Sequence, residues 1–125
     1  MTPKITDSEL EVMRILWREG RPLSFKEIRT ELESKTKWNK STIQTLITRL
    51  RDKEAISVQM HYITLYSANV AEQDYIRAEE KSLLDKLFSG DAKNLVASLC
   101  QSGQLNEKDI DELKQFFNME EEKKL

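Results

Sequence analysis

The hydrophobic period of the chain changes once in its first half, and this change limits the possible folds. Before Glu54, apolar residues recur three or four positions apart, which is the spacing of one helix face. After Glu54 they alternate, beginning with Ile56, Val58 and Met60, and a second alternating run follows. The pattern predicts helices first and then two short antiparallel strands, joined by a tight turn near Gln59 to Tyr62.

Capping residues mark the starts of three helices before the strands. The first helix opens with a capping box in which Thr6 is the N-cap and Glu9 is the N3 residue that bonds back to it. The second helix opens with a similar box at Ser24 and Glu27. The third starts near Asn39, a favourable N-cap residue. Three helices followed by a hairpin is the order of a winged helix-turn-helix, in which the third helix enters the major groove of DNA.

The third helix has two distinct faces. Apolar residues at helical spacing are expected to face the core: Ile43, Leu46, Ile47 and Leu50. Short or donor-bearing side chains are left for the outside or its edges: Lys40, Ser41, Thr42, Gln44, Thr45, Thr48 and Arg49. Because residues 39–51 contain no carboxylate, whereas a helix selected only for solubility normally carries glutamate, this face is suited to lie against phosphates.

The outward residues divide by the chemistry they offer to DNA. Cations that could contact phosphates and position the helix are Lys40, Arg49 and Arg51. Candidates for base edges are Thr42, Gln44 and Thr45, because glutamine can bond adenine through two atoms and a threonine methyl can pack on the thymine methyl. A further phosphate contact is expected from the backbone N–H of Ser24, at the start of the second helix.

Charge is distributed unevenly along the 125 residues. Residues 1–70 hold twelve Lys and Arg against nine Asp and Glu, whereas residues 71–125 hold eight against thirteen. A mildly basic half joined to an acidic half fits a DNA-facing module attached to one that faces away from DNA. We therefore expect a winged-helix DNA-binding domain over residues 1–70 and a helical dimerisation domain over residues 71–125.

The second half is expected to be helical throughout, so the fold class is mainly α with one small β-hairpin. A unit this small cannot bury a large core, so its stability is expected to depend on contact with a second copy of the chain. The apolar residues assigned to that dimer contact are Leu83, Leu84, Leu87, Phe88, Leu95, Val96, Leu99, Ile110, Leu113, Phe116 and Phe117.

Composition argues against an enzyme and against metal chemistry. The chain has one histidine and one cysteine, Cys100, too few for a clustered metal site, and no Gly-rich phosphate loop. We expect no cofactor, and we expect Cys100 to be buried as a small hydrophobe in its apolar run. No apolar run approaches the length of a membrane span, and the N-terminus lacks a signal-peptide core, so a cytoplasmic protein without membrane insertion is expected.

Four segments together resemble the penicillinase repressor and methicillin-resistance regulator family of winged-helix repressors. Thr6–Trp17 is similar to that family's opening helix, and Trp38–Leu50 is similar to its recognition helix. Asn94–Val96 and Leu105–Leu113 resemble its dimerisation segment. The resemblance covers nearly the whole chain, and its motifs are specific only in combination.

The resemblance implies a homodimer that represses transcription by binding a two-fold symmetric operator in double-stranded DNA, for a resistance or stress operon. It also implies release by a sensor-linked protease that cuts the dimerisation domain at an asparagine–phenylalanine bond. That bond falls at Ser98–Leu99, where neither residue matches. The multi-cysteine metal motif of the copper-responsive branch is absent, because the chain has only Cys100.

The expected wing departs from the family. Its entry is Lys53-Glu54 in place of lysine-glycine, and the hairpin from Ser57 to Tyr66 has no Lys or Arg, so its electrostatic contribution to DNA binding should be weak. Two alternatives stay open. One is a winged-helix protein-interaction module without specific DNA binding. The other is a repressor that senses a small molecule, for which the sequence offers three tyrosines near the junction of the halves, Tyr62, Tyr66 and Tyr75.

Overall fold

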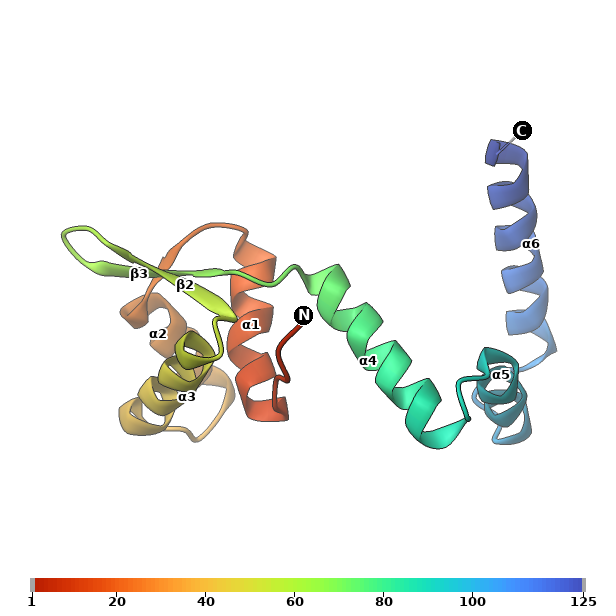
Figure 1. The fold of residues 1–125 in the computed structure, drawn as a ribbon, viewed down its shortest axis with the longest axis horizontal. Coiled ribbons are helices and arrows are strands. Elements are labelled where there is room, and N and C mark those ends of the chain that lie inside the picture. Colours follow the sequence, from red (N-terminus) through yellow and green to blue (C-terminus); the bar gives the residue numbers. More distant parts are fainter. Residues whose placement is uncertain (1, 125) are drawn as a thin grey trace. The chain divides into compact units, whose positions relative to one another are not determined.

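The computed structural model describes the backbone of residues 2–124 and the side chains of residues 2–119. Helices and strands follow one another along the chain (Figure 1), with these bounds: α1 Asp7–Glu19, β1 Leu23–Ser24, α2 Phe25–Lys35, α3 Lys40–Asp52, β2 Ile56–Met60, β3 Thr64–Ala68, α4 Glu72–Leu87, α5 Ala92–Gln101 and α6 Glu107–Lys124. The expectation of a mainly helical fold with a small antiparallel sheet is confirmed.

The chain divides into two compact units, Met1–Ala78 and Glu79–Leu125, so the first turns of α4 belong to the first unit. Within that unit the Trp17 indole donates a hydrogen bond to the Val70 carbonyl at 2.8 Å, and its ring lies 5.6 Å from the ring of Tyr75. These contacts attach the start of α4 to α1.

The first unit is built around a buried core that α1, α2, α3 and the sheet share. Its members are Ile5, Val12, Met13, Ile15, Leu16, Leu23, Ile28, Leu32, Ile43, Leu46, Ile47, Leu50, Ala55 and Ile56. Both predicted capping boxes are present: the side chains of Thr6 and Ser24 accept from the N–H groups of Glu9 and Glu27. Helix starts were thus readable from local spacing, because a capping box needs only residues three positions apart.

The sheet corrects two expectations. It has three strands in the order β1-β3-β2, because Leu23 and Ser24 pair with Tyr66 and Leu65. The predicted turn at Gln59 to Tyr62 is wrong: Met60 pairs with Thr64, so the loop is residues 61–63. The hairpin has no Asn-Gly or Asp-Gly for a two-residue turn, and a three-residue loop is the next common solution.

Candidate nucleic-acid interface

Helix α3 is held in the first unit by its apolar face and by its cap. Ile43, Leu46, Ile47 and Leu50 are all buried, as the spacing predicted. The Asn39 side chain accepts a hydrogen bond from the Thr42 N–H at 2.9 Å, which satisfies one of the free donors at the helix start. The orientation of the outward face therefore follows from burial of the opposite one.

The outward face of α3 presents the residues that the sequence assigned to DNA. The exposed ones are Lys40, Ser41, Thr42, Gln44, Thr45 and Arg49, and Thr48 is half-buried. The first turn holds no acidic residue, and Arg49 and Arg51 lie in the last turn. A surface of this kind offers donors and methyl groups to a polyanion without a repelling carboxylate.

Of the three candidates for reading bases, Thr45 and Gln44 differ in how free their polar groups are. The Thr45 hydroxyl donates to the Ser41 carbonyl at 3.0 Å, so its proton is used inside the helix, while its methyl group and oxygen lone pairs remain available. Gln44 makes no side-chain hydrogen bond within the part of the chain that the structure describes. Gln44 can therefore offer both its amide donor and its acceptor to one base.

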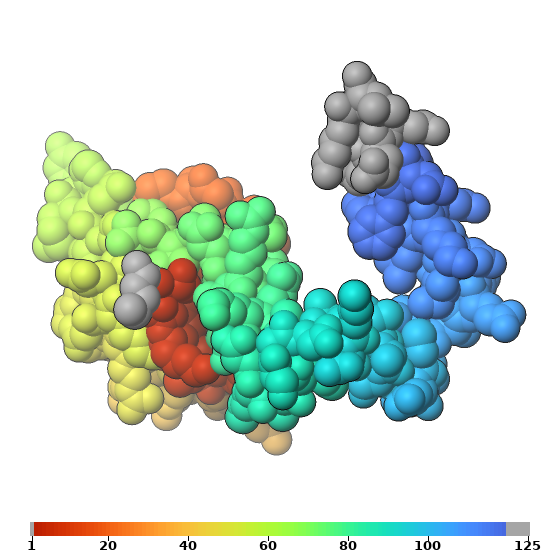
Figure 2. All heavy atoms as spheres, turned by 45° about the vertical axis from the view of Figure 1, so that its right-hand side comes forward, coloured from red at the N-terminus to blue at the C-terminus, as the bar shows by residue number. Residues whose placement is uncertain are grey.

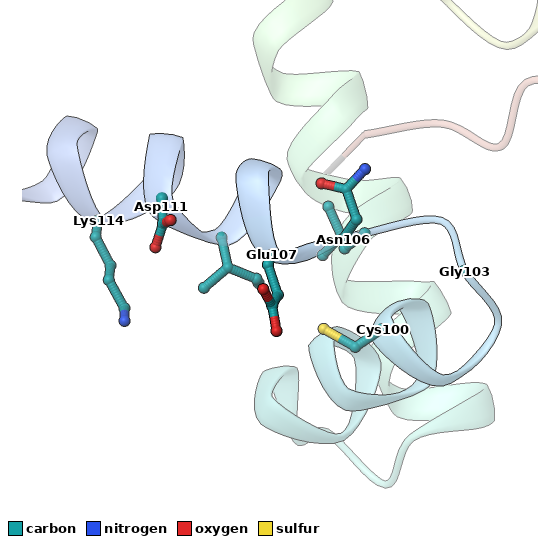
Figure 3. Close-up of a pocket in the computed structure, with 8 residues that line it drawn as sticks. Cys100, Gly103, Asn106, Glu107, Asp111 and Lys114 are labelled. Atoms are coloured by element: carbon teal, nitrogen blue, oxygen red, sulfur yellow. The ribbon is translucent and has the colours of Figure 1, made fainter.

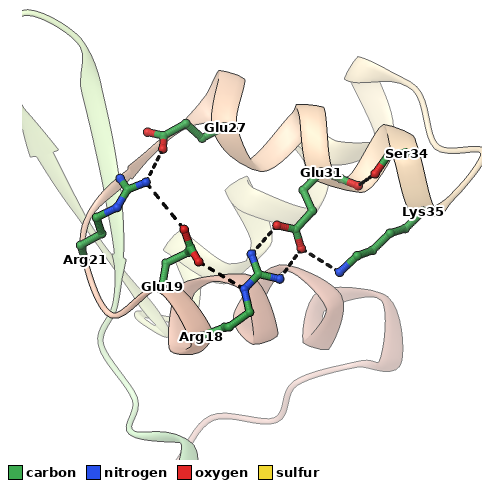
Figure 4. A network of polar contacts seen from close by, with 7 residues as sticks. All are labelled: Arg18, Glu19, Arg21, Glu27, Glu31, Ser34 and Lys35. Carbon is green, nitrogen blue, oxygen red and sulfur yellow. Dashed lines mark hydrogen bonds and ion pairs between the residues drawn. The ribbon is translucent and has the colours of Figure 1, made fainter.

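Many cations of the first unit are already paired with carboxylates. Figure 4 shows one network, in which Arg18 and Lys35 both bind Glu31, each at 2.7 Å, and Arg21 binds Glu27 at 2.7 Å. Arg18, and to a lesser extent Lys35, lower the pKa of Glu31 to about 2. Arg18 joins α1 to α2 and Arg21 joins the intervening loop to α2, while Lys35 pairs within α2, so these three cations are already engaged by carboxylates.

Some cations of the first unit have no carboxylate partner among the described residues, and three of these lie on or just before α3; Lys4, Lys26 and Arg77 are the others. Lys37, Lys40 and Arg49 make no ion pair among the described residues, whereas Arg51 lies 3.3 Å from Asp52. Lys37, which the sequence reasoning passed over, precedes the helix and is exposed. Three unpaired cations thus lie on and just before a helix that carries no acid from residue 40 to residue 51.

Lys53, at the end of α3, is occupied elsewhere. Its ammonium binds a carboxylate oxygen of Glu9 and donates to the Lys4 carbonyl at 2.8 Å. Glu9 is fully buried and also accepts from the Thr6 N–H at 2.8 Å. Burial opposes ionisation, but Lys53 and Thr6 outweigh it and lower the pKa of Glu9. No local motif could reveal this pair, because its members are 44 positions apart.

The backbone N–H of Ser24, which was expected to contact a phosphate, is already bonded to Glu27. The Ser24 N–H donates to the Glu27 carboxylate at 3.2 Å, and the hydroxyl accepts from the Glu27 N–H at 3.2 Å. A phosphate at this helix start would have to displace that bond or use the neighbouring amides of Phe25 and Lys26. The contact at Ser24 stays a prediction.

The second unit presents apolar side chains in place of a core. None of its described side chains is buried; of the residues assigned to the dimer contact, the exposed ones are Leu83, Leu87, Val96, Leu113, Phe116 and Phe117, and the half-buried ones are Leu84, Phe88, Leu95, Leu99 and Ile110. The bond predicted for cleavage, Ser98–Leu99, lies inside α5 with both residues half-buried.

The expectation that Cys100 is buried is wrong. Its thiol is exposed and lines a cleft of about 710 Å³ between α5 and α6 (Figure 3), together with Leu105, Ile110 and polar residues of α6. An apolar run in a helix has several faces, and here Cys100 falls on one that borders an open cleft.

Three helices followed by a hairpin whose first strand packs on the third helix define a winged helix-turn-helix protein. The chain belongs to the penicillinase repressor family, whose model matches residues 5–119. It is 37% identical to the penicillinase repressor of Staphylococcus aureus over 92% of this chain and 91% of the relative. It is 31% identical to that of Bacillus licheniformis over 98% of this chain and 95% of the relative.

A solved structure shares the fold and part of the sequence. The solution structure of the monomeric Bacillus licheniformis BlaI in complex with the blaP half-operator matches with a TM-score of 0.53 and 34% identity, covering 60% of this chain and 92% of that one. The family resemblance and the winged-helix fold expected from the sequence are confirmed. Within the described residues, the helices are all too short or too polar to cross a membrane.

Proposed function

We propose that this protein is a transcriptional repressor that binds a two-fold symmetric DNA operator as a homodimer. The observation that carries the proposal is the outward face of α3, which is exposed, carries no acid from residue 40 to residue 51, and presents the unpaired cations Lys40 and Arg49. The relatives support it: two are named penicillinase repressors, and a solved one is bound to a half-operator. Each α3 would lie in the major groove of one half-site.

The division of roles on α3 can be tested by substitution. A duplex selected by the protein from a random pool serves as the operator, and an unrelated duplex serves as the non-specific reference. We expect Gln44→Ala to weaken binding to the selected duplex by roughly 1–3 kcal/mol with little effect on the reference. Thr45→Ser, which keeps the hydroxyl and removes the methyl group, should have a smaller effect of the same kind.

Arg49 supplies the contrasting variant. Arg49→Ala should weaken binding to both duplexes alike and flatten the salt dependence by about two units of log–log slope per dimer, one for each lost phosphate contact. Glu33→Gln on α2 is the control and should bind as the wild type does. Equal losses on both duplexes for all three α3 variants would contradict the assignment of base readers.

The dimer half of the proposal rests on the exposed apolar side chains of the second unit. A set that includes Phe116 and Phe117, whose rings lie 5.8 Å apart, is left uncovered within one copy. Analytical ultracentrifugation at micromolar concentration should show a dimer, and Phe116→Asp should shift it toward monomer. A monomeric wild-type protein would contradict this half.

Release by proteolysis is the finer part of the proposal. A cut at Ser98–Leu99 would separate α6 from α4 and so divide the apolar set of the second unit. The bond lies inside a helix, so α5 would have to unwind locally before a protease could bind it. Mass spectrometry of the protein from cells exposed to a β-lactam should detect the two fragments; an intact chain in cells that have induced the operon would exclude this route.

The competing proposal is an interaction module that binds a protein through the same fold. Salt distinguishes the two, because binding to any duplex through phosphates is strong at low salt and is lost at high salt. Absence of duplex binding at low salt would favour the interaction module.

A further inference from the structure

The β2–β3 hairpin is uncharged in a chain where 34% of residues are charged. Residues 55–70 contain no Asp, Glu, Lys or Arg. The residues around its turn are large and outward: the exposed fraction is 77% for Met60 and 59% for Ile63, and Tyr62 is fully exposed at 108%. We call these three residues the wing tip. They are outside the core, so packing within the unit does not account for them.

The hairpin is attached to the end of the candidate DNA-binding helix. The Ala55 N–H donates to the Leu50 carbonyl of α3, and the Asn69 N–H donates to the Ala55 carbonyl, both at 2.9 Å. The Asn69 side chain also donates to the Glu54 carbonyl at 2.8 Å. These bonds tie both strands to the α3 terminus, so the direction of the wing is coupled to that of the helix.

The wing tip and α3 lie on the same side of the first unit. Figure 1 shows the hairpin extending beyond the helices at the upper left, with α2 and then α3 drawn below it, and in Figure 2 its yellow-green tip projects above the yellow surface of α3. Five-residue strands reach roughly 17 Å. If α3 occupies a major groove, a hairpin of that reach meets the flanking minor groove.

The uncharged, apolar character of the wing tip indicates which kind of surface it can bind. The hairpin offers no Lys or Arg to a phosphate backbone or an anionic membrane, since His61 is the one basic side chain of residues 55–70, and without carboxylates it is not repelled by DNA. The minor groove has apolar deoxyribose walls and acceptors on its floor, adenine N3 and thymine O2. Met60 and Ile63 offer apolar contact to the walls, and the Tyr62 hydroxyl is a donor for the floor.

We propose that the wing tip enters the minor groove beside each half-site as an apolar wedge. Apolar side chains in minor grooves partly unstack base steps and favour A·T-rich, deformable sequence. The wing would then add affinity that does not depend on salt, together with a preference for flanking sequence that α3 does not read. This inference rests on the proposed function, because it needs α3 in the major groove.

The test uses the full-length chain and the selected duplex. The double variant Tyr62→Ser with Ile63→Ser changes only exposed turn residues, and an unchanged thermal transition checks its fold. We expect its affinity to fall about 10- to 100-fold with the salt slope unchanged. Arg49→Ala is the matched comparison, because it should lower affinity and flatten the slope.

A base analogue tests whether the wing tip contacts the minor groove and not the major groove. Replacing flanking A·T pairs by G·C places the guanine N2 amino group in the minor groove and should weaken wild-type binding. Replacing them by inosine·cytosine, which lacks that amino group and keeps the major-groove edge of G·C, should restore it. The double variant should not distinguish the two duplexes.

Three results would overturn the proposal. One is a double variant that binds as tightly as the wild type while Gln44→Ala is impaired, which leaves the proposed function intact. Another is a double variant whose self-association falls while its DNA affinity does not, which assigns the wing tip to a second copy. The third is a wild type without specific duplex binding, for which Gln44→Ala is also neutral; that result removes the proposed function as well.

Discussion

The two units of the chain use apolar side chains differently. In residues 1–78, apolar side chains from α1, α2, α3 and the sheet are buried in a shared core. In residues 79–119, none of the described side chains is buried, and Phe116 and Phe117 are exposed. Burial of apolar surface is the main stabilising contribution to folding. The first unit can therefore be stable by itself, and the second depends on what covers it, which we propose is a second copy.

The largest expected effect compares one leucine from each unit. Leu50→Ala in the fully buried core should lower the free energy of unfolding by about 2–5 kcal/mol at any protein concentration. Leu113→Ala on exposed α6 should lower stability in a concentration-dependent way, because it acts through the dimer. Trp17 and Trp38 both lie in the first unit, so their fluorescence during urea unfolding reports that unit, and circular dichroism reports both. If both variants lost the same free energy of unfolding at every protein concentration, the distinction between the units would be contradicted.

A smaller effect is expected from the buried ion pair of the first unit. Glu9→Gln should cost about 1–3 kcal/mol at neutral pH by removing the charge that Lys53 binds. Because folding lowers the pKa of Glu9, its contribution is complete above the ordinary value of 4.5 and is lost as the pH falls through the lower folded-state value. The gap between wild type and variant in urea midpoint should therefore narrow from about pH 7 to about pH 3.

The matched control for Glu9 is Glu33→Gln. Glu33 pairs with Arg29 one turn away on the exposed face of α2, where such pairs contribute less than about 1 kcal/mol. A loss at Glu33 as large as that at Glu9 would show that burial is not what strengthens the Glu9 pair.

The smallest effect concerns backbone strain. Glu54 has φ of 62°, a left-handed conformation that glycine adopts without steric cost. Glu54→Gly should raise the stability of the first unit by about 1 kcal/mol. Ser89→Gly, at φ of 50° in the second unit, should leave the tryptophan transition unchanged. A lower transition midpoint for Glu54→Gly in thermal unfolding would show that the Glu54 side chain contributes more than its backbone costs.

Sequence reasoning succeeded where the determining contacts are local. The capping boxes at Thr6 and Ser24 and the buried face of α3 need only residues three or four positions apart, so helix starts and faces were readable. The two family motifs of the first half, Thr6–Trp17 and Trp38–Leu50, lie on α1 and α3, which is why the resemblance and the winged-helix order agreed. The hairpin turn was misplaced because the chain lacks the dipeptides that mark short turns.

The residues of the candidate interface were thus determined by the sequence alone: the outward face of α3 follows from the spacing of Ile43, Leu46, Ile47 and Leu50. Only the tertiary structure decided which cations of the first unit are held by distant carboxylates. Lys53 is held by Glu9 and Arg18 by Glu31, while Lys40 and Arg49 on the outward face have no carboxylate partner among the described residues. Charge counts cannot make this distinction, because an ion pair across elements depends on packing and not on sequence spacing.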